Sequence, residues 1–393
     1  MLAVLALAEF LGMSPWLLVG AVSDQLSLTP GNVAWLQALV QVGFVAGSLV
    51  ASTLNLPDLV PARFYLAGCA IVVAGVNALP LLHPGLALLL VSRFLIGFFL
   101  AGVYPPAMKM TATWFKSGRG LAIGVLVAGL IAGKSMPFLI RSLGLEKWDQ
   151  MILASSAGAA LAGVLVMIAY RDGPHAFPRR RFSWGLVPSI LAHRPPRLAI
   201  GGYLGHMWEL YAMWTWIPFF LAASSASTLG PGRVKAFASA AIAMGALGSI
   251  WGGWLADRRG RVFVVNLSMA LSGACALVVG FLFHESLALL LPLVLIWGFF
   301  VVSDSAQFSS MVTEVAPPDS VGTALTLQTS LGYLISMSTI HLVPKIVEGP
   351  GWPWAFCLLS LGPALGIVAI RRFTMSQSAP QPSIPSSQSG SAT

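Results

Sequence analysis

The stretch Glu209-Leu-Tyr-Ala-Met213-Trp-Thr-Trp216 has a counterpart near the start of the chain, Glu9-Phe-Leu-Gly-Met13-Ser-Pro-Trp16. In both copies Glu, Met and Trp stand at i, i+4 and i+7, which places them on one face of a helix. Both copies lie in apolar stretches long enough to cross a bilayer. An acidic residue at the centre of a membrane helix costs roughly 2.5–3.5 kcal/mol, so its repetition in register predicts a functional role.

Composition indicates a membrane protein. Only 9% of the 393 residues are charged and 57% are hydrophobic, whereas soluble domains have about 25% charged residues. The apolar stretches recur at the length of about 20 residues that a helix needs to span the hydrocarbon core, and they lack the alternation of a membrane barrel. We therefore predict an all-α membrane protein.

Twelve membrane helices in two sets of six are predicted. The N-terminal bundle covers 1–170, a cytoplasmic linker covers 171–197, the C-terminal bundle covers 198–372, and a Ser/Gln/Pro-rich tail at 373–393 is predicted to be disordered. The predicted spans are 2–22, 33–53, 63–82, 86–107, 118–141, 150–170, 198–222, 235–256, 262–283, 287–306, 320–343 and 352–371.

Charge placement predicts the orientation. With both termini on the cytoplasmic side of the cell membrane, the inner loops hold most of the Lys and Arg residues, as the positive-inside rule requires. The net charge of +9 is thus a feature of topology, and we expect no nucleic-acid partner. The first span has an internal Glu9 and no cleavage site, so it is predicted to be a retained helix. By comparison with the second half, this helix would start before Met1.

A repeat extends beyond the opening motif. Leu86-Ala-Leu-Leu-Leu recurs at Leu287, 201 positions later, and Gly47-Ser48 recurs as Gly248-Ser249 at the same offset. Because the duplicated unit has an even number of helices, both copies of it enter the membrane from the same side. The two bundles are therefore predicted to form a parallel repeat about an axis along the membrane normal.

The sharpest local motif is the stretch 253–261, Gly-Trp-Leu-Ala-Asp-Arg-Arg-Gly-Arg, between the eighth and ninth spans. It resembles the cytoplasmic loop signature of the major facilitator superfamily, and the resemblance covers nearly the whole chain. Arg93 with Gly97 and Gly102 is similar to the fourth-helix motif of that family. The stretch from Tyr104 to Gly124 is similar to branches that carry small anions, including monocarboxylates, oxalate, nitrate and phthalate.

A gate is predicted at the signature loop. The carboxylate of Asp257 can cap and charge-pair with the positive N-terminus of a neighbouring helix, and the family fold would place helix five there. Arg258 and Arg261 would then form breakable pairs between the bundles. Asp304, near the cytoplasmic end of helix ten, is a further gate candidate. The alternative for the loop is a pure orientation signal.

Glu9, Glu209 and His206 are the candidates for proton coupling. The resemblance implies that helices one, four, seven and ten line the central cavity, and ionisable residues occur at membrane depth on each of them. A carboxyl group in a poorly hydrated cavity changes protonation with hydration and nearby charge. His206 lies one helical turn before Glu209 and would share its proton. Alternatively, each Glu is a fixed structural strut.

The candidates for substrate binding are Arg93, Lys134, Trp16 and Trp216. Arg93 and Lys134 lie at matching depths on consecutive predicted helices, so both would face one anion. The alternative is that Arg93 pairs with a cavity carboxylate and Lys134 extends outward. Trp16 and Trp216 lie outward of the two glutamates and would form a matched cavity wall, or an interfacial belt.

The predicted function is secondary active transport by alternating access, most consistent with a small organic anion moving with protons. One alternative is a proton-driven exporter of cationic or amphipathic compounds, and another is a transport-inactive membrane sensor. Without a phosphate loop, metal cluster or nucleophile–base spacing, no cofactor, metal or enzymatic activity is expected. The expected partners are a small-molecule substrate, protons and the lipid bilayer, with the protein as a monomer.

Overall fold

The computed structural model describes residues 1–82, 85–115, 117–144, 147–175, 182–224 and 230–378. Part of the predicted linker and most of the predicted disordered tail lie outside these residues. The described chain contains helices and no strand, which confirms the all-α prediction. The last helix runs to Ser378, past the predicted end of the twelfth span.

Nine helices and two 3₁₀ turns make up the described chain before the linker. Their bounds are α1 (Leu2–Gly12), η1 (Ser14–Leu17), α2 (Leu18–Val22), α3 (Pro30–Thr53), α4 (Leu56–Leu59), α5 (Ala62–Ala78), η2 (Leu79–Leu81), α6 (Leu86–Leu100), α7 (Tyr104–Ala112), α8 (Arg119–Ser142) and α9 (Trp148–Ala169). α10 (Val187–Ala192) then lies in the linker.

The rest of the chain forms a second, similar set of helices. Their bounds are α11 (Arg194–Ala223), α12 (Pro231–Arg259), α13 (Arg261–Val279), α14 (Leu287–Ser303), α15 (Ser305–Val315), α16 (Val321–Glu348), α17 (Trp352–Cys357) and α18 (Leu361–Ser378).

The number of membrane-spanning helices agrees closely with the prediction. In the described chain, 11 helical segments are long and apolar enough to cross a membrane. The remaining predicted span, 198–222, falls in α11, which is 30 residues long. Its His, Glu, Trp and Tyr residues lower its mean hydropathy, so α11 differs from the others in polarity and not in length.

The first, fourth, tenth and twelfth predicted spans are each divided, the twelfth by the 3₁₀ turn Leu358–Ser360 between α17 and α18. The first consists of α1, the 3₁₀ turn η1 and α2, because Pro15 cannot donate a helical hydrogen bond. The fourth is divided between α6 and α7, and the tenth is divided at Asp304, between α14 and α15. By contrast, Pro218 lies inside the continuous helix α11.

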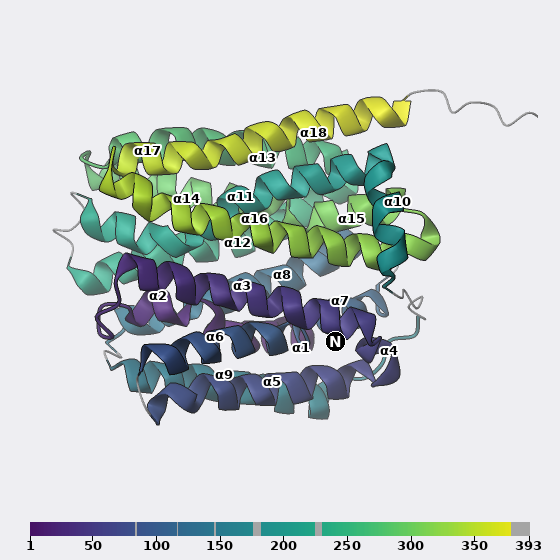
Figure 1. Ribbon diagram of the computed structural model, residues 1–393, viewed down its shortest axis with the longest axis horizontal. Coiled ribbons are helices and arrows are strands. Elements are labelled where there is room, and N and C mark those ends of the chain that lie inside the picture. Colours follow the sequence, from purple (N-terminus) through teal and green to yellow (C-terminus); the bar gives the residue numbers. More distant parts are fainter. Residues whose placement is uncertain (83–84, 116, 145–146, 176–181, 225–229, 379–393) are drawn as a thin grey trace, which may run out of the picture.

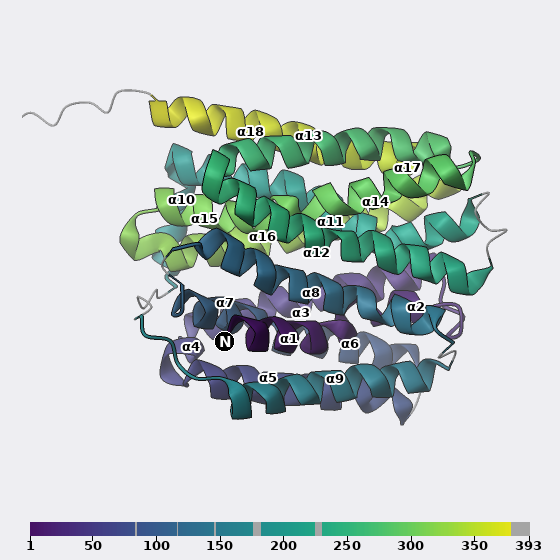
Figure 2. The same ribbon diagram turned by 180° about the vertical axis from the view of Figure 1, so that it is seen from behind.

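The helices are arranged in two halves. Figures 1 and 2 show α1–α9 on one side of the molecule and α10–α18 on the other. The contact surface between them, called the seam here, is formed where α8 packs along α12 and α3 along α16. The long axis of the molecule runs along the helices. We call the end at which α18 finishes the terminal end, and the end at which α12 begins the opposite end.

Equivalent glycines bring equivalent helices together in the two halves. A Cβ atom on Gly97 would lie 1.9 Å from the carbonyl oxygen of Val40, and one on Gly298 would lie 1.8 Å from that of Ala241. Both pairs are offset by the same 201 positions as the sequence repeat. Any side chain at these two glycines would therefore push α6 away from α3, or α14 away from α12. The sequence repeat thus preserves equivalent helix–helix contacts in the two halves.

Candidate functional site

Lys134 lies at the centre of the seam among aromatic rings. Its side chain is 1% exposed, and its Nζ donates a hydrogen bond to Tyr211 Oη at 2.8 Å. The ammonium lies 3.9 Å from the centroid of the Trp16 ring, 5.0 Å from Tyr211 and 5.3 Å from Trp214. These four residues, called the lysine cage here, come from α8, η1 and α11. A buried ammonium held by ring faces is stabilised by cation–π attraction.

Close packing of α1 on α8 brings Glu9 into the neighbourhood of Lys134. A Cβ on Gly133 would lie 2.2 Å from the carbonyl oxygen of Phe10, so the two backbones touch there. Glu9 is fully buried and interacts electrostatically with Lys134. Neither carboxylate oxygen of Glu9 has a hydrogen-bond partner within the described part of the chain. The two predicted site residues are thus brought together, with the carboxylate unsatisfied.

Arg93 holds the break in helix one. Its Nη1 donates to the carbonyl oxygen of Pro15 at 2.6 Å, and its Nη2 donates to that of Trp16. The 3₁₀ turn leaves such carbonyls without helical partners. Gln37, with its amide oriented to satisfy both contacts, donates to Trp16 O at 3.3 Å and accepts from Trp16 Nε1 at 3.1 Å. The Trp16 ring is therefore fixed in front of Lys134 by residues of the first half.

Further side chains of the seam complete this centre. Tyr333 on α16 lies 3.1 Å, Oη to Oη, from Tyr211, and its ring packs on Trp16 and Phe44. Ser336 donates to Gln41 Oε1 across the seam at 2.8 Å. None of Tyr333, Phe44, Ser336 and Gln41 was predicted from the sequence to belong to the site. For Tyr211 and Trp214, the crowding of aromatic residues in 208–216 was a usable signal.

Glu209 and Trp216 lie away from the lysine cage. Glu209 is 1% exposed and accepts hydrogen bonds from Ser272 Oγ at 2.9 Å and from Trp297 Nε1 at 2.6 Å. Trp216 donates to the carbonyl oxygen of Ile340 at 3.0 Å. Both residues are thus satisfied within the second half, and the repeated motif occupies two different environments.

His206 and Asp304 form a buried pair in the second half. His206 Nδ1 lies 2.9 Å from Asp304 Oδ1, and both side chains are 2% exposed. Asp304 stands at the division between α14 and α15, and it interacts electrostatically with Glu209. The structure therefore gathers three of the predicted residues, His206, Glu209 and Asp304, into one cluster beside the break in the tenth span.

At the terminal end, Asp257 contacts the start of α8 across the seam. Its Oδ2 accepts a hydrogen bond from Leu121 N at 3.3 Å, where the helix N-terminus favours a negative charge. Arg261 instead pairs with Glu314, its Nε donating at 2.8 Å, and Arg258 stacks on Trp254 at 4.1 Å from the ring centroid. These contacts of the two arginines lie within the second half, whereas that of Asp257 joins the halves.

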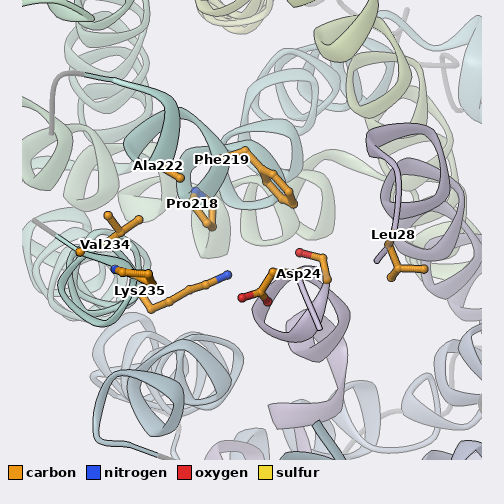
Figure 3. Close-up of a pocket in the computed structure, with 10 residues that line it drawn as sticks. Asp24, Leu28, Pro218, Phe219, Ala222, Val234 and Lys235 are labelled. Carbon is orange, nitrogen blue, oxygen red and sulfur yellow. The ribbon is translucent and has the colours of Figure 1, made fainter. Parts of the chain in front are cut away.

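A pocket of about 280 Å³ lies at the opposite end, between the two halves. Ser23, Asp24 and Leu28 line it from the first half, and the last turn of α11 and the first turns of α12 line it from the second. Figure 3 shows Lys235 extending from α12 toward the carboxylate of Asp24. In the described residues, no group of three or more His, Cys, Asp or Glu side chains is placed to hold a metal ion.

A family model described as Major Facilitator Superfamily matches residues 1–340 and 236–392 of this chain. The chain is also similar to two fungal proteins named MFS-type transporters. It is 26% identical to hasB of Aspergillus fumigatus over 52% of this chain and 48% of that protein. It is 27% identical to pytF of Aspergillus terreus over 44% of this chain and 58% of that protein. The matched part thus spans roughly half the length of each relative.

Two solved structures share the fold over nearly the whole chain. An alanine mutant of the nucleoside transporter NupG is 14% identical, with a TM-score of 0.69, and the match covers 95% of this chain and 98% of that one. The human organic anion transporter MFSD10 is 15% identical, also with a TM-score of 0.69, and the match covers 94% and 98%. At such low identity the similarity concerns the fold.

Proposed function

We propose a secondary active transporter, because this chain belongs to the Major Facilitator Superfamily and is a multi-pass membrane transporter rather than an enzyme. The proposed cargo is a small organic anion, which would move together with protons. The two bundles, 1–170 and 198–372, would rock about the lysine cage and expose it to each side in turn. From the placement of its basic loops, we further infer that the protein lies in the cell membrane with both termini cytoplasmic. We also infer that it acts as a monomer.

The position of Lys134 carries the proposal for an anion. Lys134 places an ammonium at the point where both halves meet, and a carboxylate there would gain a charge-assisted hydrogen bond at low local dielectric. The hydroxyls of Tyr211 and Tyr333 lie beside it as further donors. Trp16 and Phe44 supply apolar surface for the rest of a small organic anion.

The same geometry disfavours a cationic cargo. The ring faces that would stack on a bound cation are already turned toward the ammonium of Lys134, and a second cation beside it would be repelled. An exporter of lipophilic cations would therefore have to displace Lys134 first. If expression lowered accumulation of a lipophilic cation and Glu209→Gln reversed that effect, the exporter alternative would replace the anion proposal.

Proton coupling in the first half is assigned to Glu9. A bound carboxylate at Lys134 would leave two carboxylates near one ammonium, and a proton on Glu9 removes the excess negative charge. Glu9 has no competing hydrogen bond within the described residues, so its protonation breaks no hydrogen bond there. An anion and a proton would then cross together, with little net charge left at the centre of the bilayer.

A second proton position is assigned to the cluster of His206, Glu209 and Asp304. Proton transfer between His206 and Asp304 changes the charges at the 2.9 Å contact that bridges α11 and the division of the tenth span. Because Asp304 stands at that division, its charge state would influence how α14 and α15 are joined, and this makes it a gating residue. Glu209, fixed by Ser272 and Trp297, would receive or return the proton.

Gating at the terminal end is assigned to Asp257. Opening the seam at this end requires the hydrogen bond to Leu121 N to break. Arg258 and Arg261 would support the gate indirectly, because their contacts with Trp254 and Glu314 fix the end of α12 that presents Asp257. At the same end, the Ser52–Thr326 contact at 3.1 Å also joins the halves.

Counterflow in proteoliposomes tests the proposed function. Vesicles loaded with unlabelled lactate, oxalate or benzoate should accumulate the labelled form of at least one of them, faster when the outside is acidic. Lys134→Gln should abolish this accumulation, whereas Lys345→Gln, an exposed lysine on α16, should not. A protein that binds these anions but shows no counterflow would be a sensor and not a carrier.

A further inference from the structure

The pocket at the opposite end has the dimensions and lining of a small-molecule site. Its volume of about 280 Å³ lies just below the usual range of ligand sites, roughly 300–1,000 Å³, and suits a compact ligand. Leu28, Pro218, Phe219 and Val234 give it apolar walls, and Lys235 and Asp24 are its charged lining residues. In Figure 3, the end of the Lys235 side chain lies beside the carboxylate of Asp24, and Phe219 lies above them.

The charge balance around this pocket favours an anion. Asp24 is already paired, since its Oδ2 accepts from Arg141 Nη2 at 2.8 Å. Its side chain is 49% exposed, so part of its charge is screened by solvent. Lys235 makes a long hydrogen bond to the carbonyl oxygen of Gly20 at 3.4 Å and interacts electrostatically with Asp24. Asp24 is thus shared between Arg141 and Lys235, so its carboxylate does not neutralise Lys235 alone.

We propose that this pocket is a second anion-binding site, in which a small carboxylate binds Lys235 while its apolar body packs against Phe219 and Leu28. The class of ligand rests on the proposed function, because an anion moving between Lys134 and this end of the molecule would pass this pocket. The pocket and the lysine cage share no residue, so the two sites can be emptied separately by mutation.

Binding at this site would also loosen the seam. Lys235 belongs to α12 in the second half, and its acceptor Gly20 belongs to α2 in the first half. A carboxylate bound to Lys235 replaces the contacts of the ammonium with Gly20 and Asp24. The entering anion would thereby remove one contact that closes the molecule at the opposite end, which couples arrival of the anion to opening.

Equilibrium binding of radiolabelled benzoate to the full chain in nanodiscs of neutral lipid tests the proposal. We expect wild type to bind two equivalents, Lys134→Gln and Lys235→Gln one each, and the double variant none. Loss of a charged hydrogen-bond partner weakens binding by about tenfold or more. Lys235→Arg should retain both sites, and benzamide, which has no charge, should not compete.

Arg233→Gln is the matched control, because Arg233 is an exposed cation two residues from Lys235 and does not line the pocket. The Arg233→Gln variant should bind two equivalents of benzoate. A single equivalent lost only in Lys134→Gln would overturn the second site and leave the proposed function intact. A single equivalent lost only in Lys235→Gln would support the second site and refute the lysine cage. Benzoate that fails to bind in neutral discs would also overturn the proposal. So would a lipid headgroup found at Lys235 in place of benzoate when the discs contain anionic lipid.

Discussion

Lys134 Nζ donates a hydrogen bond to Tyr211 Oη at 2.8 Å, and these two residues belong to α8 and α11, on opposite sides of the seam. The contact joins the only lysine of α8 to the most aromatic part of α11. Movement of one half against the other must change it. It therefore connects the charge that would hold an anion with the motion that would carry it.

Replacing Lys134 should abolish anion transport without unfolding the protein. In Lys134→Gln the amide keeps a donor for Tyr211 but removes the charge, so binding of the transported anion should weaken by about tenfold or more. Thermal unfolding should change little, because Glu9, which loses its neighbouring ammonium, can take up a proton and so avoid an uncompensated buried charge. Measured binding equal to that of wild type would exclude Lys134 from the site.

Glu9→Gln should separate anion exchange from proton coupling. The variant cannot take up a proton at this position, so uptake driven by a proton gradient should be lost while exchange of anion for anion persists. Exchange and gradient-driven uptake are both measured in proteoliposomes with the same labelled anion. Gradient-driven uptake that survives in Glu9→Gln but is lost in His206→Gln would move the proton position to the second half.

Arg93→Met should destabilise the protein as well as stop transport. The substitution leaves the carbonyl oxygen of Pro15 without its donor and that of Trp16 with Gln37 alone. A buried acceptor left unsatisfied costs about 1–3 kcal/mol. Thermal unfolding in detergent should therefore occur at a lower temperature. Arg233→Met, at an exposed arginine, is the control. Unchanged stability in Arg93→Met would show that helix one holds its break without Arg93.

Asp257→Asn should shift the molecule toward the conformation that is open at the terminal end. A carboxylate at a helix N-terminus contributes about 0.3–1 kcal/mol, so the change in population is a few-fold. A cysteine placed at Thr326, which contacts Ser52 across the seam, should then react faster with a soluble maleimide, in a background without the three native cysteines. A slower reaction, or an unchanged one, would deny Asp257 a part in closure.

Gly298→Ala should be among the most damaging of small substitutions. Its new Cβ would lie 1.8 Å from the carbonyl oxygen of Ala241, so α14 would have to move from α12, at a cost of about 1–3 kcal/mol or more. Gly68→Ala is the matched control, since a Cβ there has no atom within 4 Å and should stabilise α5 by about 0.5–1 kcal/mol. Thermal unfolding of the two variants in parallel measures the difference.

The architecture could be predicted from the sequence because bilayer thickness fixes helix length and the repeat fixes the relation between the halves. The spans around 33–53 and 118–141 were found within a few residues of α3 and α8. The divisions of the fourth and tenth spans were not predicted. A break such as that at Asp304 depends on which neighbouring helix satisfies the released backbone groups, and sequence spacing does not contain that information.

The site was harder to predict than the fold. The Glu–Met–Trp pattern suggests one common face in both copies, yet Trp16 follows a 3₁₀ turn whereas Trp216 continues a regular helix. The two tryptophans consequently lie in different surroundings. Contacts across the seam, such as Tyr333 with Trp16, join residues from different halves, and periodicity within a helix does not indicate the residue they will meet.

The rings around Lys134 have a consequence for the unloaded protein. A carrier that completes net cycles must return through its closed state without cargo, and a bare ammonium at mid-bilayer would make that return slow. Trp16 and Tyr211 solvate the ammonium when no anion is present, so the protein supplies its own substitute ligand. How readily these rings release the lysine would then set the balance between affinity for cargo and the speed of the empty return.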